Sequence, residues 1–462
     1  MRPKLSIPSR VRWRSRLWNR SNVALKSHAN GRPLATHLEP ASVGLRPAKL
    51  SNHLKWAECC GMLVVLVYFI RGTVLPWYIH VPDSAWIGLT TAALCVGGGM
   101  IVTGGGKWRW SWVAVLVAFA AGICGAEQPT SSALHWLGLS LLIFPLGPVV
   151  LNSAGIAMRS AAWKLTVSGI TNLTAIFVVW YVLHLPCPGG RSPFASFMNQ
   201  SMLLGPIAGM GVGIATARAI HTRSKRWGAL AVLSSLPLLA SGSRVANLAA
   251  VASVCFLLLR RKPLLGLVIV VLCVFCVGSF IASSGKQPTG NSPTAALSGK
   301  GTENTRADLW QSRIVEFKSS PLFGIGVAMG TGSGSVIGED GSIRVEPGSS
   351  YLAILAMTGG VGTLAFFSAL GLLLFGFASN HQQAPVDKDI LSVVGIFLAV
   401  NGIAEGWILG FGSPLCFLFW LWLGNVGDAA FQPARAIAQR SLLARQRSRL
   451  SEPALRPLIS DV

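Results

Sequence analysis

The sequence predicts an all-α polytopic membrane protein with about twelve transmembrane helices and one long outer loop between helices nine and ten. Three observations support this prediction: the apolar composition, the spacing of the apolar segments and the distribution of charge. Of the 462 residues, 52% are hydrophobic and only 12% are charged. A typical soluble domain is about one-quarter charged, so this composition argues against a soluble enzyme, a coiled coil or a disordered chain.

Apolar segments recur along most of the chain at lengths that suit a bilayer. A membrane-spanning helix needs about 20 apolar residues, and most of the segments approach this length, although 227–240 and 245–259 are short. The predicted spans are Ala57–Ile79, Ala85–Thr103, Trp110–Ala126, Leu134–Leu151, Leu165–Leu185, Ser201–Ile220, Trp227–Ala240, Val245–Leu259, Leu264–Ser284, Ser350–Phe377, Ile390–Ala404 and Trp407–Gly424.

The net charge of +23 lies largely in the two terminal segments. Residues 1–56 contain twelve Lys or Arg and one acid, and we predict a disordered basic tail. Residues 426–462 contain six Arg and three acids and form a second basic tail. In a soluble protein such an excess suggests a nucleic-acid partner, but in a membrane protein it reports topology. We therefore expect membrane lipids, and no nucleic acid, among the partners.

Charge in the loops sets the predicted orientation. With the N-terminal tail in the cytoplasm, the short outer loops carry only two cations, Arg191 and Arg244. Cytoplasmic loops are enriched in Lys and Arg, so both termini are predicted to be cytoplasmic. The twelve cations of the inner loops are Lys107, Arg109, Arg159, Lys164, Arg218, Arg223, Lys225, Arg226, Arg260, Arg261, Lys262 and Lys388.

These assignments divide the chain into five parts. A basic cytoplasmic tail (1–56) precedes nine spans (57–284), a long outer loop (285–349), three spans (350–425) and a second basic cytoplasmic tail (426–462). A loop of this length between spans is usually functional rather than a simple connector.

A short amphipathic helix is predicted inside the long loop, from Thr305 to about Lys318, ending before Pro321. Two readings remain open for the face that carries its cations and aromatic residues. It either binds an anion or lies beside lipid headgroups at the membrane surface. The residues on this face follow one another at spacings of four, three and four: Arg306, Trp310, Arg313 and Phe317.

Two outer arginines are candidates for binding an anionic substrate. Arg244 lies in the turn Ser241-Gly242-Ser243-Arg244, and Arg191 follows Pro188-Gly189-Gly190 in an earlier outer loop. A guanidinium pairs bidentately with phosphate oxygens and stays charged at any relevant pH. The alternative is that both side chains extend to lipid phosphates.

The cysteines give no indication of a metal or a cofactor. Eight of the nine lie in apolar segments, and Cys273-Val-Phe-Cys276 has no second pair to complete a metal-ligand set. We therefore expect neither a metal nor another cofactor.

Three ordered motifs carry a family resemblance. They are Ser241-Gly-Ser-Arg244 before an apolar span; Arg306-Ala-Asp-Leu-Trp310 followed by Pro321-Leu-Phe-Gly-Ile-Gly326; and Ser349-Ser-Tyr-Leu352 followed by Thr358-Gly-Gly-Val-Gly362. With about nine spans, a long outer loop and three more spans, the chain resembles the O-antigen ligase and O-antigen polymerase superfamily. The likeness is best between Arg218 and Gly424.

The resemblance implies glycosyl transfer in the bacterial inner membrane. Family members transfer a glycan from an undecaprenyl-diphosphate carrier to a sugar acceptor on the outer, periplasmic face. A lipid diphosphate leaving group needs fixed cations, so the resemblance favours Arg244 as the main catalytic cation. Arg191, Arg306 and Arg313 would bind substrate, and Glu405 would hold an arginine or a sugar hydroxyl.

One feature departs from the family pattern. Members often carry a His just before the returning span, whereas this chain has Val345-Glu346-Pro347-Gly348-Ser349 and no His in the loop. Glu346 is the nearest candidate for a base, since burial can raise a carboxyl pKa into a useful range. A solvated acid, or a partner for Arg344 or Arg313, is the alternative for Glu346.

Two other functions remain open. A flippase or transporter of lipid-linked oligosaccharides would also need cations for a diphosphate, but it is expected to show internal repeats, and none is recognisable here. The second alternative is that the protein is a non-catalytic subunit of a polysaccharide-export system. The expected partners are a lipid-linked glycan donor, a glycan or lipid acceptor, and polysaccharide-export proteins.

Overall fold

The computed structural model describes residues 47–73, 82–126, 128–183, 198, 201–268, 305–327, 335–337, 343–345, 348–380 and 383–431. The chain divides into the units Met1–Pro47 and Ala48–Val462, and the fold described here is that of the second unit. Arg191, Glu346 and most of the predicted ninth span lie outside the described residues.

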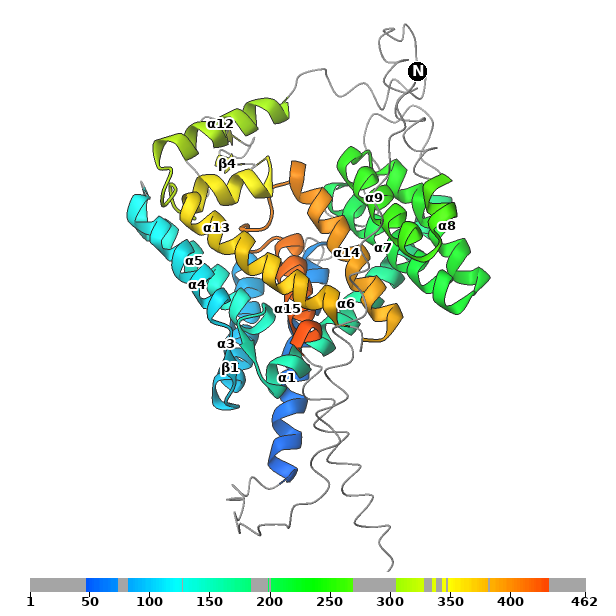
Figure 1. The fold of residues 1–462 in the computed structure, drawn as a ribbon, viewed down its shortest axis with the longest axis horizontal. Coiled ribbons are helices and arrows are strands. Elements are labelled where there is room, and N and C mark those ends of the chain that lie inside the picture. Colours follow the sequence, from blue (N-terminus) through cyan, green and yellow to red (C-terminus); the bar gives the residue numbers. More distant parts are fainter. Residues whose placement is uncertain are drawn as a thin grey trace, which may run out of the picture. The chain divides into compact units, whose positions relative to one another are not determined.

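Helices dominate the second unit (Figure 1). They are α1 (Pro47–Arg71), α3 (Asp83–Thr103), α4 (Trp110–Ala121), the 3₁₀ helix η1 (Gly122–Gly125), α5 (Pro129–Leu146), α6 (Ser153–Leu183), α7 (Ser201–Thr222), α8 (Lys225–Ala240), α9 (Arg244–Arg261), α12 (Thr305–Ser319), α13 (Ser350–Ser379), α14 (Pro385–Ala404) and α15 (Pro414–Phe431). Two antiparallel pairs complete the set: β1 (Lys107–Trp108) with β2 (Val150–Leu151), and β3 (Ser335–Ile337) with β4 (Ile343–Val345).

Six helices of the described part are long and apolar enough to cross a membrane, so the protein is an all-helical, polytopic membrane protein. All twelve predicted apolar segments overlap described helical residues, the ninth only over 264–268. The helix predicted inside the long loop is confirmed as α12. The six candidate spans are Asn52–Arg71, Ala85–Thr103, Ser153–Leu183, Leu203–Thr222, Ser350–Ser379 and Pro414–Phe431.

Proline is the first residue of four described helices. They are α1 (Pro47), α5 (Pro129), α14 (Pro385) and α15 (Pro414). The first helical position suits proline because its missing N–H has no partner there and its fixed φ matches the helix. The last predicted span accordingly begins at Pro414 rather than at Trp407, which lies in the turn before α15.

Helix α15 is the centre of the bundle. It packs against α5, α6, α13 and α14, and nearly all of its side chains are buried. Trp420 of α15 stacks edge-on against Trp112 of α4 and Phe366 of α13, with ring centroids 6.1 and 6.2 Å apart. This aromatic cluster joins three helices that are far apart in the sequence.

Helix α13 is broken at Gly359, and a neighbouring segment fills the break. Gly359 has φ 64° and ψ −169°, a conformation open essentially to glycine alone. The backbone of 321–326 lies along the break and replaces the missing helical hydrogen bonds. The N–H groups of Ile325 and Gly326 donate to the carbonyls of Ala356 and Met357 (3.0 and 3.1 Å), and those of Gly360 and Val361 donate to Pro321 and Leu322 (2.8 and 3.1 Å).

The bundle has two ends, defined by the contacts between helix termini. The first, called the α12 end, contains the starts of α9, α13 and α15 and the ends of α8 and α14. Figure 1 shows α12 beside the start of α13 at this end. The second, called the Asp428 end, contains the β1–β2 pair, the ends of α7, α9 and α13, and the start of α14.

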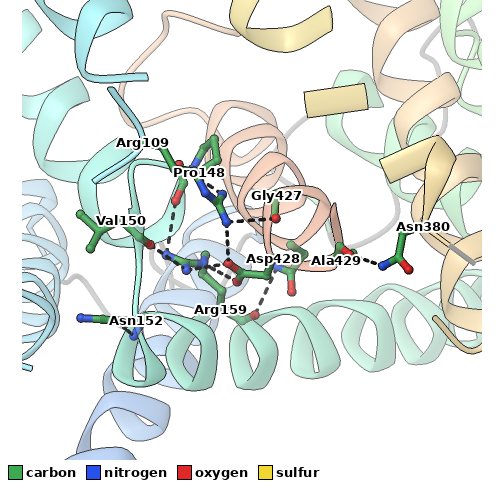
Figure 2. A network of polar contacts seen from close by, with 12 residues as sticks. Arg109, Pro148, Val150, Asn152, Arg159, Asn380, Gly427, Asp428 and Ala429 are labelled. Atoms are coloured by element: carbon green, nitrogen blue, oxygen red, sulfur yellow. Dashed lines mark hydrogen bonds and ion pairs between the residues drawn. The ribbon is translucent and has the colours of Figure 1, made fainter. Parts of the chain in front are cut away.

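A buried ion pair closes the Asp428 end (Figure 2). Asp428 of α15 accepts two hydrogen bonds from the Arg159 guanidinium, at 2.7 and 2.8 Å. Arg109 Nη2 is 3.6 Å from the same carboxylate, and burial lowers the pKa of Arg109 to about 10, which leaves it charged at neutral pH. The Nη atoms of both arginines also donate to backbone carbonyl oxygens, those of Pro145, Gly147, Pro148, Val150 and Gly427.

The helix bounds correct three predictions of inner-loop cations. Arg159 and Lys164 both lie within α6, and the Arg159 side chain is fully buried. Lys388 lies in the first turn of α14. Helix α15 continues past Gly424 to Phe431, which brings Asp428 to Arg159.

A second buried carboxylate joins α7, α9 and α14. Asp389 is fully buried, and Arg261 Nε and Nη2 donate to its two oxygens at 2.7 and 3.0 Å. His221 Nε2 lies 2.8 Å from Asp389 Oδ2. Because a charge buried without a partner is costly, this pairing fixes the start of α14 against the ends of α7 and α9.

Substitution of Gly359 tests the break in α13. We expect Gly359→Ala to lower the free energy of unfolding by at least about 1–3 kcal/mol, the cost of this backbone region for a non-glycine residue. An added Cβ would also lie 2.3 Å from the Leu322 carbonyl oxygen. Gly371→Ala in the same helix is the control, since a Cβ there meets nothing within 4 Å. Equal melting temperatures of the two detergent-purified variants would contradict the argument.

Neutralising Asp428 tests the ion pair. Asp428→Asn should destabilise the protein by about 3–5 kcal/mol, because Arg159 is then buried with no anionic partner. Asp387→Asn, an exposed acid in the first turn of α14, serves as the matched control and should have little effect. Thermal unfolding in detergent measures both, and an unchanged Asp428→Asn midpoint would show that the pair is dispensable.

Candidate functional site

Ser350, at the start of α13, is the hub of the α12 end. Its N–H and hydroxyl donate to the Glu405 carbonyl at 3.1 and 2.7 Å. The same hydroxyl oxygen accepts from the N–H groups of Trp407 and Ile408 at 3.0 and 3.3 Å. The residue that follows the long loop is thereby tied to the turn between α14 and α15.

Two aromatic side chains strengthen this junction. The Tyr351 hydroxyl donates to the Ala399 carbonyl at 2.7 Å, and Trp407 Nε1 donates to Asn401 Oδ1 at 2.9 Å. Asn401 is fully buried, and its Nδ2 has no hydrogen-bond partner among the described residues. Both bonds cross from one helix or turn to another, so they fix the positions of the chain segments around Glu405.

Helix α12 is anchored to the segment that leads into α13. Trp310 Nε1 donates to the Gly348 carbonyl at 3.2 Å. Gly348 has φ 70°, and a Cβ there would lie 2.8 Å from that of Leu309. The Pro321–Gly326 segment then leads from α12 into the break in α13, so α12 is joined both to the segment before α13 and to the break within it.

Arg244 is the first residue of α9, where its side chain is exposed. Ser243 caps the helix, because its hydroxyl accepts from the Ala246 N–H at 3.3 Å. Gly242 takes a positive φ of 67°, which closes the tight turn after α8. Helix α9 runs antiparallel to α14, since Asp389 near the start of α14 meets Arg261 at the end of α9. Arg244 therefore lies at the end of the bundle where α14 terminates.

An anion-binding face requires an exposed cation, and the Arg313 side chain is not exposed. Its side chain is buried, and Nη1 lies 2.6 Å from the Glu316 carboxylate one turn along α12. This pairing was not predicted, although Arg and Glu at i and i+3 are a recognised helical pair. Any substrate that reaches Arg313 must share the guanidinium with Glu316.

The remaining predicted residues are only partly described. Glu405 ends α14 with a half-buried side chain and supplies the carbonyl that Ser350 binds. Arg306 belongs to α12, but its side chain lies outside the description, as do Arg191 and Glu346. Within the described part of the chain, no group of three His, Cys, Asp or Glu side chains forms a set that could hold a metal ion.

Comparison with known families covers the segment that builds this end. The model of the O-antigen ligase family matches residues 229–367, from within α8 to within α13. These residues form an O-antigen ligase family domain. The domain includes the Ser241–Arg244 turn, α12, the Pro321–Gly326 segment and the part of α13 that contains the break at Gly359. No curated protein matches the chain.

The family match confirms the recognition made from the motifs. The expected order of turn, loop helix, Pro-Leu-Phe-Gly-Ile-Gly segment and returning helix is the order within the matched residues. Family membership implies ligase or polymerase activity on lipid-linked glycans, typically by a membrane enzyme. It does not identify the sugar, the acceptor or the catalytic side chains.

Proposed function

We propose that the protein transfers a glycan from an undecaprenyl-diphosphate carrier to a sugar acceptor on the outer face of the bacterial inner membrane. The observation that carries the proposal is the match of the O-antigen ligase family to residues 229–367, which contain the three motifs. In the proposed topology, about twelve helices cross the membrane and the loop between the ninth and tenth spans contains α12.

The proposed orientation rests on the distribution of cations. The Asp428 end carries most of the basic residues at helix termini, including the run Arg260-Arg261-Lys262 and the group Arg223, Lys225 and Arg226. This bias favours a cytoplasmic Asp428 end and cytoplasmic termini. The α12 end then faces the periplasm, where the carrier-linked glycan would be presented.

The proposed chemistry is a substitution at the anomeric carbon of the donor sugar. An acceptor hydroxyl oxygen forms the new bond to that carbon, the bond to the carrier diphosphate breaks, and the acceptor proton passes to a base. The diphosphate leaves with added negative charge, which a guanidinium stabilises through bidentate hydrogen bonds. We assign this role to Arg244, with Arg191 and Arg306 as further cations toward the donor and Glu405 toward a sugar hydroxyl. Arg313 would contribute only by sharing its guanidinium between the donor and Glu316.

A deletion strain complemented with an Arg244→Ala variant tests the assignment. We expect transfer to fall by at least about 100-fold, as when one charge-stabilising donor is removed, with normal abundance of the protein in the membrane. Lys318→Ala removes an exposed cation from α12 at the same end and should leave transfer intact. Transfer at the wild-type level in Arg244→Ala would eliminate this mechanism.

The deletion strain also separates the two reactions of the family. Loss of chain length with repeat units retained would identify a polymerase, whereas carrier-linked polymer that accumulates would identify a ligase. An unchanged surface polysaccharide would contradict the proposed glycosyl transfer. It would favour a flippase or a non-catalytic export subunit instead.

Glu346 is the proposed base in place of the missing histidine. Glu346→Gln should reduce the transfer rate by about 10²–10⁴-fold, the usual contribution of a positioned base. Glu339→Gln, at another acid of the same loop, is the control for a general change in loop charge. Rates measured with purified protein and a lipid-linked donor compare the two, and equal rates would remove Glu346 from the site.

A further inference from the structure

A groove between α13 and α14 is not used by the proposed reaction. It encloses about 410 Å³ and is bordered on one side by α9. Its lining is mainly aromatic and aliphatic, and includes Phe256, Phe366, Leu370, Leu374, Phe377 and Ile396. Helices α13 and α14 pack more extensively against α15 and α9, respectively, than against each other. The groove is large enough for a ligand but offers few polar partners along its length.

The length of the groove matches one leaflet of a bilayer. Its wall on α14 extends from Lys388 to Ala399, which corresponds to about 16 Å at 1.5 Å per residue. The hydrocarbon core of a bilayer is about 30 Å thick. A hydrocarbon chain that enters at one end of the groove would therefore reach about the midplane.

Positive charge gathers at one end of the groove. Arg260 and Lys388 line it at the Asp428 end, and the Arg260 side chain is 36% exposed. Lys388 Nζ donates to the backbone carbonyls of Ala378 and Asn380 rather than to an acid. The opposite end is lined by Tyr351.

The nearest acid does not neutralise this end. Asp389 Oδ1 lies 3.6 Å from Arg260 Nη1, but Arg261 and His221 occupy the same carboxylate at 2.7 and 2.8 Å. Arg260, Arg261 and Lys388 therefore share the single carboxylate of Asp389, without counting His221, while Asp387 in the same turn of α14 acts on Arg218. An anionic group at the mouth of the groove would be attracted, and a guanidinium pairs well with phosphate oxygens.

We propose that this groove binds an anionic glycerophospholipid, with its phosphate at Arg260 and one acyl chain between α13 and α14. The lipid belongs to the leaflet at the Asp428 end, opposite Arg244 and the α12 end. It fills the space that α13 and α14 leave between them, and so links these helices to α9.

Lipid retention tests the proposal on the purified full chain. Nanodiscs containing phosphatidylglycerol and phosphatidylcholine with identical acyl chains provide the probes, and native mass spectrometry counts the lipids that stay bound. We expect one phosphatidylglycerol to be retained in preference to phosphatidylcholine. Arg260→Gln should reduce that preference about fivefold, the effect expected of one cation at a membrane surface. Lys262→Gln removes an equal charge from an exposed residue that is absent from the lining and should preserve the preference.

A photoactivatable phosphatidylglycerol locates the bound lipid without any substitution. Its crosslinks should fall on residues 370–378 and 388–399 of the wild-type protein. Ala399→Trp, which narrows the apolar end without a change in charge, should abolish them. Equal retention of the two lipids would overturn the proposal, as would equal effects of Arg260→Gln and Lys262→Gln. A photocrosslinking group placed at Ala378 or Leu391 gives a further test. Capture of residues 269–284, or of undecaprenyl phosphate, in place of the phospholipid would also overturn the proposal.

Discussion

The peptide groups released where α13 breaks at Gly359 constrain the rest of the structure. In a bilayer an unpaired N–H or C=O costs several kcal/mol, so a broken helix needs a second backbone beside it. The segment 321–326 supplies that backbone through four hydrogen bonds. Glycine at 324 and 326 allows it to approach so closely, since an added Cβ at Gly324 would lie 2.4 Å from the Met357 carbonyl carbon. Helix α12 is thereby tied to a membrane helix rather than left as part of a free loop.

Charge is organised in opposite ways at the two ends of the bundle. At the Asp428 end, Asp428 and Asp389 each bind arginine side chains from helices distant in sequence, and these buried pairs hold α6, α7, α9, α14 and α15 in register. At the α12 end, the described helix termini carry fewer cations, and Arg244 presents an exposed side chain. The proposed glycosyl transfer would use Arg244 as a cation toward the diphosphate, whereas the arginines that bind Asp428 and Asp389 hold helices together.

The sequence predicted where along the chain the segments of the candidate site lie. It predicted few of the contacts between them. The motif around Ser349–Leu352 was expected to mark the return into the membrane, and α13 does begin at Ser350. That Ser350 binds the Glu405 carbonyl and two N–H groups beyond it could not be read from a local pattern, because the partners lie 55 to 58 residues away. Arg313 was expected on a face that binds an anion or lies beside lipid headgroups, yet its side chain is buried and pairs with Glu316.

The sequence by itself determined that this is a helical membrane protein, where most helices lie, and that a domain of the O-antigen ligase family lies within it. Those features follow from runs of apolar residues, helix-start signals and ordered motifs, all of which are local along the chain. The tertiary structure alone decided which charges meet. Arg159 and Asp428 are 269 residues apart. Only the packing of α15 against α6 brings them together as a buried ion pair. The break at Gly359 was equally beyond the sequence, since its stability depends on a segment more than 30 residues upstream.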